Sequence, residues 1–132
     1  MKVVVDANIF LSVVLNEPEK DRIIEKTIGM ELISPEILPY EIGNALTAMA
    51  KRNKLNRDQI IQSFQYFKEI PVRFVNVAID SALEISLEHD IYAYDAYYLE
   101  TAKKLKLQLL TLDQKMKSIA RELSISLLEV SI

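Results

Sequence analysis

Hydrophobic and polar positions recur along the chain with two different periods, one typical of strands and the other of helices. Short runs of β-branched and aliphatic residues predict strands at Val3 to Val5, Leu32 to Ser34, Val72 to Val75, Leu107 to Thr111 and Ser126 to Val130. Apolar residues three or four positions apart predict helices at Ala7 to Leu15, Glu19 to Gly29, Leu38 to Asn53, Arg57 to Glu69, Val77 to His89, Asp95 to Lys106 and Gln114 to Leu123. This alternation predicts an α/β fold with a five-stranded, mostly parallel sheet flanked by helices.

The length and composition are those of one globular domain, expected to span residues 1–132. Hydrophobic residues make up 50% of the chain and charged residues 27%, with only two glycines and four prolines for linkers. The absence of cysteine excludes disulfides and thiolate metal ligands. The longest apolar run, Ile9 to Leu15, is far shorter than the about 20 residues that cross a membrane, and Asp6 interrupts any signal peptide. We therefore expect a cytoplasmic protein without a membrane segment.

Two acidic residues directly follow apolar, strand-like segments. Asp6 comes after Val3 to Val5, and Asp113 comes after Leu107 to Leu112. In open α/β sheets, ligands bind in the crevice at the carboxyl ends of the strands. Both acids are therefore expected to face one crevice. Taken alone, each also has a simpler interpretation as the N-cap of the helix that follows it.

Two further acids lie near the starts of predicted helices. Glu41 comes soon after the strand at Leu32 to Ser34, with Pro35 and Pro39 marking the loop and the first helical turn. Asp95 begins a segment of good helix formers, as a cap or a first-turn residue. A first turn that follows a strand lies near the same edge of the sheet. All four acids are therefore expected to converge.

Four converging carboxylates predict a site for a divalent cation: Asp6, Glu41, Asp95 and Asp113. Mg²⁺ and Mn²⁺ prefer oxygen ligands, whereas Zn²⁺ favours His and Cys, and the chain has one His and no Cys. A cation would also relieve the repulsion that raises the pKa values of crowded carboxylates. We expect Asp6, Asp95 and Asp113 to hold the metal, directly or through water. Glu41 would hold a second ion or orient the attacking water in phosphodiester hydrolysis.

Other residues near the acids have structural interpretations that compete with functional ones. His89 suits the C-terminal end of a helix, where the helix dipole favours it, better than the role of a catalytic base. Asn44 shares a helix face with Glu41 and lies either in the cleft or on the surface. Four tyrosines around Asp95 are expected mainly in the core, with one or two free to stack on bases: Tyr92, Tyr94, Tyr97 and Tyr98.

The net charge of −3 weakly disfavours a nucleic-acid ligand, but the basic residues are clustered. One cluster consists of Lys51, Arg52, Lys54 and Arg57, a second of Lys103, Lys104 and Lys106, and a third of Lys115, Lys117 and Arg121. Solvated helix faces and helix C-termini explain each cluster taken alone. Together, the clusters permit phosphate binding without requiring it.

Four segments resemble the PIN domain family, and within it the VapC toxin group. They are Val-Val-Asp-Ala-Asn at 4–8, Tyr-Glu-Ile-Gly-Asn-Ala-Leu at 40–46, Tyr-Asp-Ala-Tyr-Tyr-Leu at 94–99 and Leu-Leu-Thr-Leu-Asp at 109–113. The resemblance implies a Mg²⁺- or Mn²⁺-dependent ribonuclease acting on RNA, usually a homodimer, with strand order 3-2-1-4-5. It also implies a cognate antitoxin protein that blocks the site. The four acids match the family's acidic quartet, and Asn8 and Thr111 match supporting polar positions that orient the acids.

Other protein classes fit the same residues less well. A haloacid-dehalogenase-type phosphatase needs a second Asp two residues after Asp6, where this chain has Asn8. A receiver domain needs an Asp at the end of the third strand, where Val75 and Asn76 stand. The remaining alternative is a non-catalytic PIN-like module that binds RNA or a protein. Its usual mark is the loss of one or more acids, and this chain keeps all four.

Overall fold

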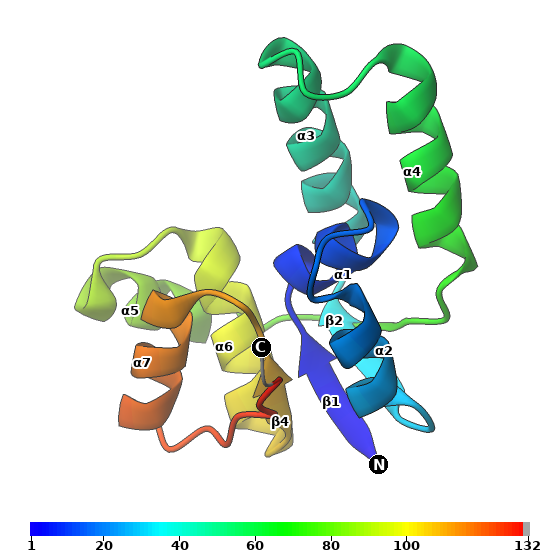
Figure 1. The fold of residues 1–132 in the computed structure, drawn as a ribbon. Helices are drawn as coiled ribbons and strands as arrows, with labels where there is room; N and C mark the ends of the chain where they lie inside the picture. Colours follow the sequence, from blue (N-terminus) through cyan, green and yellow to red (C-terminus); the bar gives the residue numbers. More distant parts are fainter. Residues whose placement is uncertain (131–132) are drawn as a thin grey trace.

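Strands and helices alternate along residues 1–130, the part of the chain that the computed structural model describes (Figure 1). The strands are β1 (Lys2–Val5), β2 (Glu31–Pro35), β3 (Arg73–Val75) and β4 (Gln108–Leu110). The helices are α1 (Ala7–Val14), α2 (Lys20–Thr27), α3 (Leu38–Lys51), α4 (Arg57–Glu69), α5 (Ile79–His89), α6 (Ala93–Leu105) and α7 (Gln114–Glu122). These bounds agree closely with the predicted ones. Within this range, none of the helices is long and apolar enough to cross a membrane.

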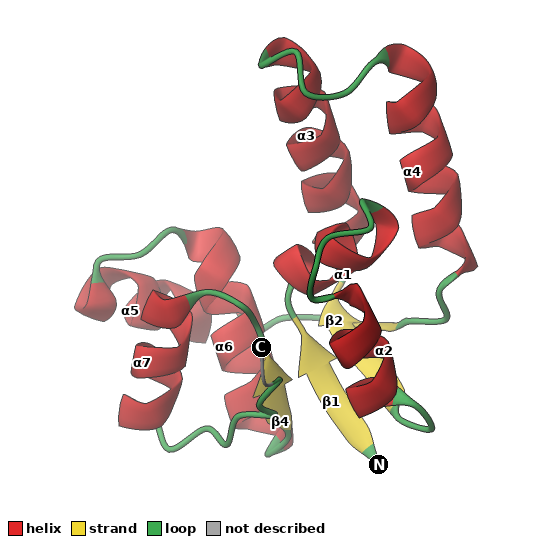
Figure 2. Ribbon diagram, in the orientation of Figure 1, coloured by secondary structure: helices red, strands yellow, loops and turns green. Residues whose placement is uncertain are grey.

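The strands form one parallel sheet in the order β3-β2-β1-β4. Figure 2 shows β1 between β2 and β4. β1 is central, because Val4 pairs with Ile33 of β2 on one side and with Leu109 of β4 on the other. Val3, Val4 and Val5 have almost no exposed surface, as expected for a parallel strand that is covered on both faces. The predicted α/β fold with a parallel sheet flanked by helices is confirmed, and the strands follow the order 3-2-1-4.

The fifth strand, predicted at Ser126 to Val130, is not formed. Instead, Leu127 makes a single parallel bridge to Leu109. Leu109 N–H donates to Ser126 O, and Leu128 N–H donates to Leu109 O, each at 2.9 Å. The bridge lies next to β4, where the fifth strand was expected. The segment has no fully buried face along 126–130, so side-chain packing does not extend the pairing beyond this bridge.

The helices gather in two groups around the sheet (Figure 1). α6 packs against β1, β2 and β4, and α5 and α7 pack against α6. α1 contacts α2, α3 and α4, and α3 and α4 form a hairpin that projects past the sheet. Tyr98 and Leu99 of α6 are fully buried and are among the largest core side chains. This packing places the first turn of α6 beside the carboxyl end of β1.

Apolar residues on α3 and α4 complete the core of the domain. Ile42 and Leu46 of α3 and Phe67 of α4 are buried in the core. Phe67 meets Phe10 of α1 edge-to-face, with ring centres 5.6 Å apart. Ile60 is only partly buried against this core. The inner face of the hairpin therefore stabilises the monomer, and it holds the first turn of α3 in place over the end of β1.

Candidate active site

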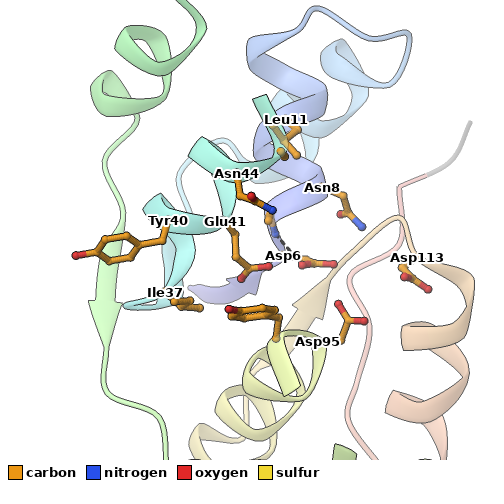
Figure 3. Close-up of a pocket in the computed structure, with 12 residues that line it drawn as sticks. Asp6, Asn8, Leu11, Ile37, Tyr40, Glu41, Asn44, Asp95 and Asp113 are labelled. Atoms are coloured by element: carbon orange, nitrogen blue, oxygen red, sulfur yellow. Dashed lines mark hydrogen bonds between the residues drawn. The ribbon is translucent and has the colours of Figure 1, made fainter. Parts of the chain in front are cut away.

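The four predicted acids line one cavity at the carboxyl end of β1 (Figure 3). Asp6 follows β1 directly, Asp113 precedes α7, and Glu41 and Asp95 lie in the first turns of α3 and α6. The cavity has a volume of about 340 Å³. Its other lining residues are Ala7, Asn8, Leu11, Ile37, Tyr40, Asn44, Ala45 and Tyr94. The structure thus brings all four acids to one cavity, while their role as metal ligands stays a prediction.

Asp6 is buried, with 5% of its surface exposed, and its two oxygens have different partners. Oδ1 accepts a hydrogen bond from the backbone N–H of Ala7 at 2.7 Å, and Asp6 is the N-cap of α1. Oδ2 accepts from the Thr111 hydroxyl at 2.7 Å. Burial raises the pKa of Asp6 to about 6 against the lowering effect of these hydrogen bonds, and the charges of Asp95 and Asp113 add to the rise. Asp6 therefore both caps a helix and faces the cavity.

The hydroxyl of Thr111 connects the ends of β1 and β4. Besides donating to Asp6, it accepts from the backbone N–H of Asp113 at 3.1 Å and from the side-chain amide of Asn8 at 3.3 Å. Asn8 Oδ1 in turn accepts from the backbone N–H of Leu112 at 3.2 Å. Thr111 thus bonds a carboxylate as predicted. Asn8 was also expected to bond a carboxylate, but its amide bonds the Thr111 hydroxyl instead. Asn8 therefore contacts Asp6 only through Thr111.

Glu41 is held by a residue that the sequence interpretation assigned to packing. The hydroxyl of Tyr98 donates to Glu41 Oε1 at 2.7 Å. Burial raises the pKa of Glu41 to about 7, with Asp6 and Asp95 adding to the rise and the Tyr98 hydrogen bond opposing it. Burial and the nearby Glu41 carboxylate raise the pKa of Tyr98 above its usual range, so Tyr98 stays a donor. Tyr98 comes three residues after Asp95 and so shares its helix face; this spacing was the sequence signal that Tyr98 lies near the acids.

Asp95 and Asp113 differ in how their helices begin. Asp113 is the N-cap of α7 and accepts from the backbone N–H of Met116 at 3.1 Å. Tyr92 occupies the N-cap position of α6, so the interpretation of Asp95 as a cap is wrong and the first-turn interpretation holds. Burial raises the pKa of Asp95, the charge of Asp113 raises it further, and Lys115 opposes the rise. Asp95 is therefore available to a ligand in the cavity.

The remaining candidates divide between the cavity and other parts of the molecule. Asn44 and Tyr94 line the cavity. His89 ends α5 as predicted, and its Nδ1 lies 3.3 Å from a carboxylate oxygen of Glu122 on α7. Tyr92 is 80% exposed, so it is not a core residue. Of the predicted accessory residues, Asn44 and Tyr94 therefore have access to a ligand, and His89 has a structural partner.

The chemistry of the lining suits a hydrated hard cation. All charged side chains that line the cavity are carboxylates, and carboxylate oxygens are the ligands that Mg²⁺ and Mn²⁺ prefer. Within residues 1–130, no three His, Cys, Asp or Glu side chains are placed to hold one ion directly between them. Mg²⁺ usually keeps several waters and is bound through one or two carboxylates. The charge and oxygen ligands of the lining thus suit such a cation, and direct ligation by three of these side chains is not formed within this range.

Together, fold and cavity define a class of protein: a parallel α/β domain whose acidic residues gather at the carboxyl end of its central strand. A model of the PIN domain family matches residues 3–122. The chain belongs to the PIN domain family. The resemblance that the four sequence motifs carry is thereby confirmed.

The similarity extends to individual proteins. Ribonuclease VapC3 of Pyrobaculum aerophilum is 30% identical over 122 residues, which cover 88% of this chain and 92% of that protein. This relative confirms the resemblance to the VapC group. The crystal structure of PAE2754 from P. aerophilum aligns with a TM-score of 0.70 and 20% identity, and the alignment covers 90% of this chain and 79% of that chain. VapBC2 from Rickettsia felis, bound to a DNA fragment from their promoter, aligns with a TM-score of 0.68 and 14% identity. This alignment covers 96% of this chain and 97% of that chain.

The raised pKa of Asp6 predicts that the metal-free protein loses stability as the pH rises. Asp6 titrates near pH 6 when folded, compared with an ordinary value of 3.8. Because the folded state keeps this proton longer, the free energy of unfolding falls between about pH 4 and about pH 6. Asp6→Asn cannot ionise, so it should reduce this fall by up to about 3 kcal/mol.

Urea unfolding in a chelating buffer, at several pH values from about 4 to about 8, measures this effect. Asp21→Asn is the matched control, since Asp21 is an exposed Asp on α2. In this control, the free energy of unfolding should fall with pH as steeply as in the wild-type protein. If the free energy of unfolding fell equally with pH in wild type and Asp6→Asn, a raised pKa of Asp6 would be contradicted.

Proposed function

We propose that this chain is a metal-dependent endoribonuclease that hydrolyses RNA phosphodiester bonds, and that it is the toxin of a VapBC-type pair. The observation that carries the proposal is the gathering of Asp6, Glu41, Asp95 and Asp113 around one cavity. The name of its 30%-identical relative, Ribonuclease VapC3, supports the RNA substrate. The ion would be Mg²⁺ or Mn²⁺, because the charged lining groups are carboxylates.

Each acid has a role in the proposed reaction. Asp6, Asp95 and Asp113 hold the ion, directly or through water. When bound, the ion lowers the pKa of a water and polarises the phosphoryl oxygen. Glu41 orients the attacking water or holds a second ion. Its pKa near 7 suits a group that accepts a proton at neutral pH, and Tyr98 holds its carboxylate in place.

The proposed partners follow from the VapC similarity. A cognate antitoxin would block the cavity, and an arginine inserted among the carboxylates would make charge-assisted hydrogen bonds there. Two structural neighbours support such a partner: VapBC2, and FitAcB from Neisseria gonorrhoeae. FitAcB aligns with a TM-score of 0.62 and 17% identity, and the alignment covers 95% of each chain. We further propose that residues 1–132 form one PIN domain, that it acts as a homodimer and that it works in the cytoplasm.

The first prediction of this proposed function concerns RNA cleavage. Wild-type protein should cut RNA only with added Mg²⁺ or Mn²⁺, and Asp6→Asn and Asp95→Asn should each reduce the rate at least about a hundredfold, because each removes a charge from the cavity. The assay uses single-stranded and structured RNA. Asp21→Asn, on exposed α2, controls for a general loss of negative charge.

Equal cleavage by wild type and both variants would exclude this site assignment. Metal-dependent binding of RNA without any cleavage would instead favour the non-catalytic module.

The second prediction tests the hydroxyl that joins β1 and β4. Thr111→Val keeps the volume of the side chain but leaves Asp6 Oδ2 without its donor, so metal affinity and activity should fall roughly 10–100-fold. Thr101→Val is the matched control, because Thr101 is also buried and its hydroxyl, among residues 1–130, bonds only Tyr97 O in its own helix. A Thr111→Val protein that matches the Thr101→Val control in metal titration and cleavage would show that Thr111 does not orient the acids.

The third prediction concerns the toxin role. Expression of the chain alone should arrest growth of a bacterial host, and co-expression of the adjacent small reading frame should relieve the arrest. Asp95→Asn should express without arrest, since it removes an acid from the cavity. Growth unaffected by wild-type expression would argue against a toxin, and it would leave the cleavage assay to decide the enzymatic activity separately.

A further inference from the structure

A group of basic residues lies at the turn of the α3–α4 hairpin, where the hairpin projects past the sheet (Figure 1). All of these side chains are exposed, and the ion pairs formed within residues 1–130 involve none of them. Residues 51–57 contain no acid, and Asp58 is the first acid that follows. This group is named the basic tip, and it consists of Lys51, Arg52, Lys54 and Arg57.

Helix dipoles account for only part of the basic tip. Lys51 lies in the last turn of α3 and Arg52 is its C-cap, where the dipole favours a cation. Lys54 lies in the loop, and Arg57 begins α4, where the dipole disfavours a positive charge. Cations this close together repel one another, and they form no ion pair in the described chain. A bound anion would relieve this repulsion, so the basic tip favours an anionic partner.

Local contacts fix the backbone of the basic tip. Asn56 and Gln59 form a capping box at the start of α4, in which each side chain accepts from the backbone N–H of the other at 2.9 Å. The backbone N–H of Lys54 donates to Met49 O at 2.9 Å, and Leu55 is half-buried against the core. The tip is therefore ordered without a ligand, which lowers the entropy cost of binding one.

One face of α3 connects the basic tip to the cavity that the four acids line, here called the acid cavity. Tyr40 and Asn44 line this cavity, and Thr47 and Lys51 follow on the same helix face. All four residues are exposed, so this face is open to solvent. Lys51 comes seven residues after Asn44, which corresponds to about 10 Å of helical rise. A nucleic-acid strand with about 3.4 Å of rise per phosphate covers this length with about three nucleotides.

We propose that the basic tip binds the phosphate backbone of the RNA strand, about three to five nucleotides from the bond cleaved in the acid cavity. This inference rests on the proposed ribonuclease function. The charged side chains that line the acid cavity are all carboxylates, which repel the phosphates on either side of the cleaved bond. The substrate therefore needs cationic contacts outside the cavity, and the exposed face of α3 leads to them.

The surface of the tip suits a phosphate backbone better than a protein partner. Within residues 51–57, none of the large apolar side chains is exposed, whereas protein interfaces usually have an apolar centre. Separate cations on a fixed loop suit the charges of a backbone, which repeat at regular intervals. Contacts of this kind position a strand without reading its bases. The basic tip thus holds the RNA in register with the acids and adds affinity for any sequence.

RNA binding at several salt concentrations tests the basic tip without requiring cleavage. All proteins carry Asp95→Asn to prevent cleavage, and the affinity for a labelled single-stranded RNA is measured in Mg²⁺ buffer. Replacing three residues of the tip together, Lys51→Gln, Arg52→Gln and Lys54→Gln, should weaken binding at least about tenfold at low salt. The slope of log affinity against log salt should fall by about 2, because each contact to a single strand contributes about 0.7.

The matched control removes the same charge at the other end of the sheet. Lys103, Lys104 and Lys106 are exposed and lie at the end of α6, whose first turn is beside the acids. Replacing all three with Gln should change RNA affinity by no more than about twofold, since charges more than about 10 Å away are screened at 0.1 M salt. Equal losses in the two triple variants, or an unchanged salt slope in the tip variant, would overturn the proposal.

Cleavage of RNAs of different length links the basic tip to the reaction. A short RNA that the protein cuts is extended with further nucleotides on its 5′ or its 3′ side. Extension on one side should raise kcat/KM at least about fivefold, through KM, because the added contact is made equally in the ground state and the transition state. The tip variant should cut the short and extended RNAs at the same kcat/KM.

The outcomes separate the basic tip from the proposed ribonuclease. Cleavage with the same dependence on length in the wild type and the tip variant would reject the tip and leave the ribonuclease intact. RNA binding that depends on the tip, in a chain that cuts no RNA, would support the tip while rejecting the ribonuclease. A tip variant that binds RNA normally but no longer binds a co-expressed antitoxin would make the tip a protein contact and overturn the proposal.

Discussion

The hydrogen bond from Thr111 Oγ1 to Asp6 Oδ2 joins the carboxyl ends of β1 and β4, and the geometry of the acid cavity depends on it. Asp6 is buried, and a buried carboxylate without donors is strongly destabilising. Thr111 and the Ala7 N–H supply the two donors that Asp6 needs. Because Thr111 also accepts from the Asp113 N–H and from Asn8, one hydroxyl positions the start of α7 relative to β1.

Helix N-termini offset only part of the repulsion among the acids. Asp6 and Asp113 cap α1 and α7, where the helix dipole favours negative charge. Burial and neighbouring acids nevertheless raise the pKa values of Asp6, Glu41 and Asp95. Lys115 lowers the pKa of Asp95 but does not line the cavity. The crowding that costs folding free energy is the same feature that would favour a bound cation, as at many functional sites.

The short segment between β2 and α3, with the first turn of α3, lines both the acid cavity and a second cavity beside it. Glu36 lines the second cavity, Ile37 and Tyr40 line both, and Glu41 faces the acids. Pro39 lies in the first turn of α3, where its missing N–H breaks no helical hydrogen bond. A rigid turn of this kind fixes the position of Glu41 relative to the lining that the two cavities share.

Hydrophobic periodicity predicted the strands and helices of the described chain, and acids after apolar strands indicated the sheet edge, because both signals are local in sequence. The segment at Ser126 to Val130 has strand-like residues, but it forms only one bridge because it has no buried face to extend its pairing. Tyr98 and Glu41 lie 57 residues apart, and Thr111 and Asp6 lie 105 apart. Only the tertiary structure decided these partners, because a hydrogen bond depends on where two groups meet in space, and local sequence patterns do not encode that.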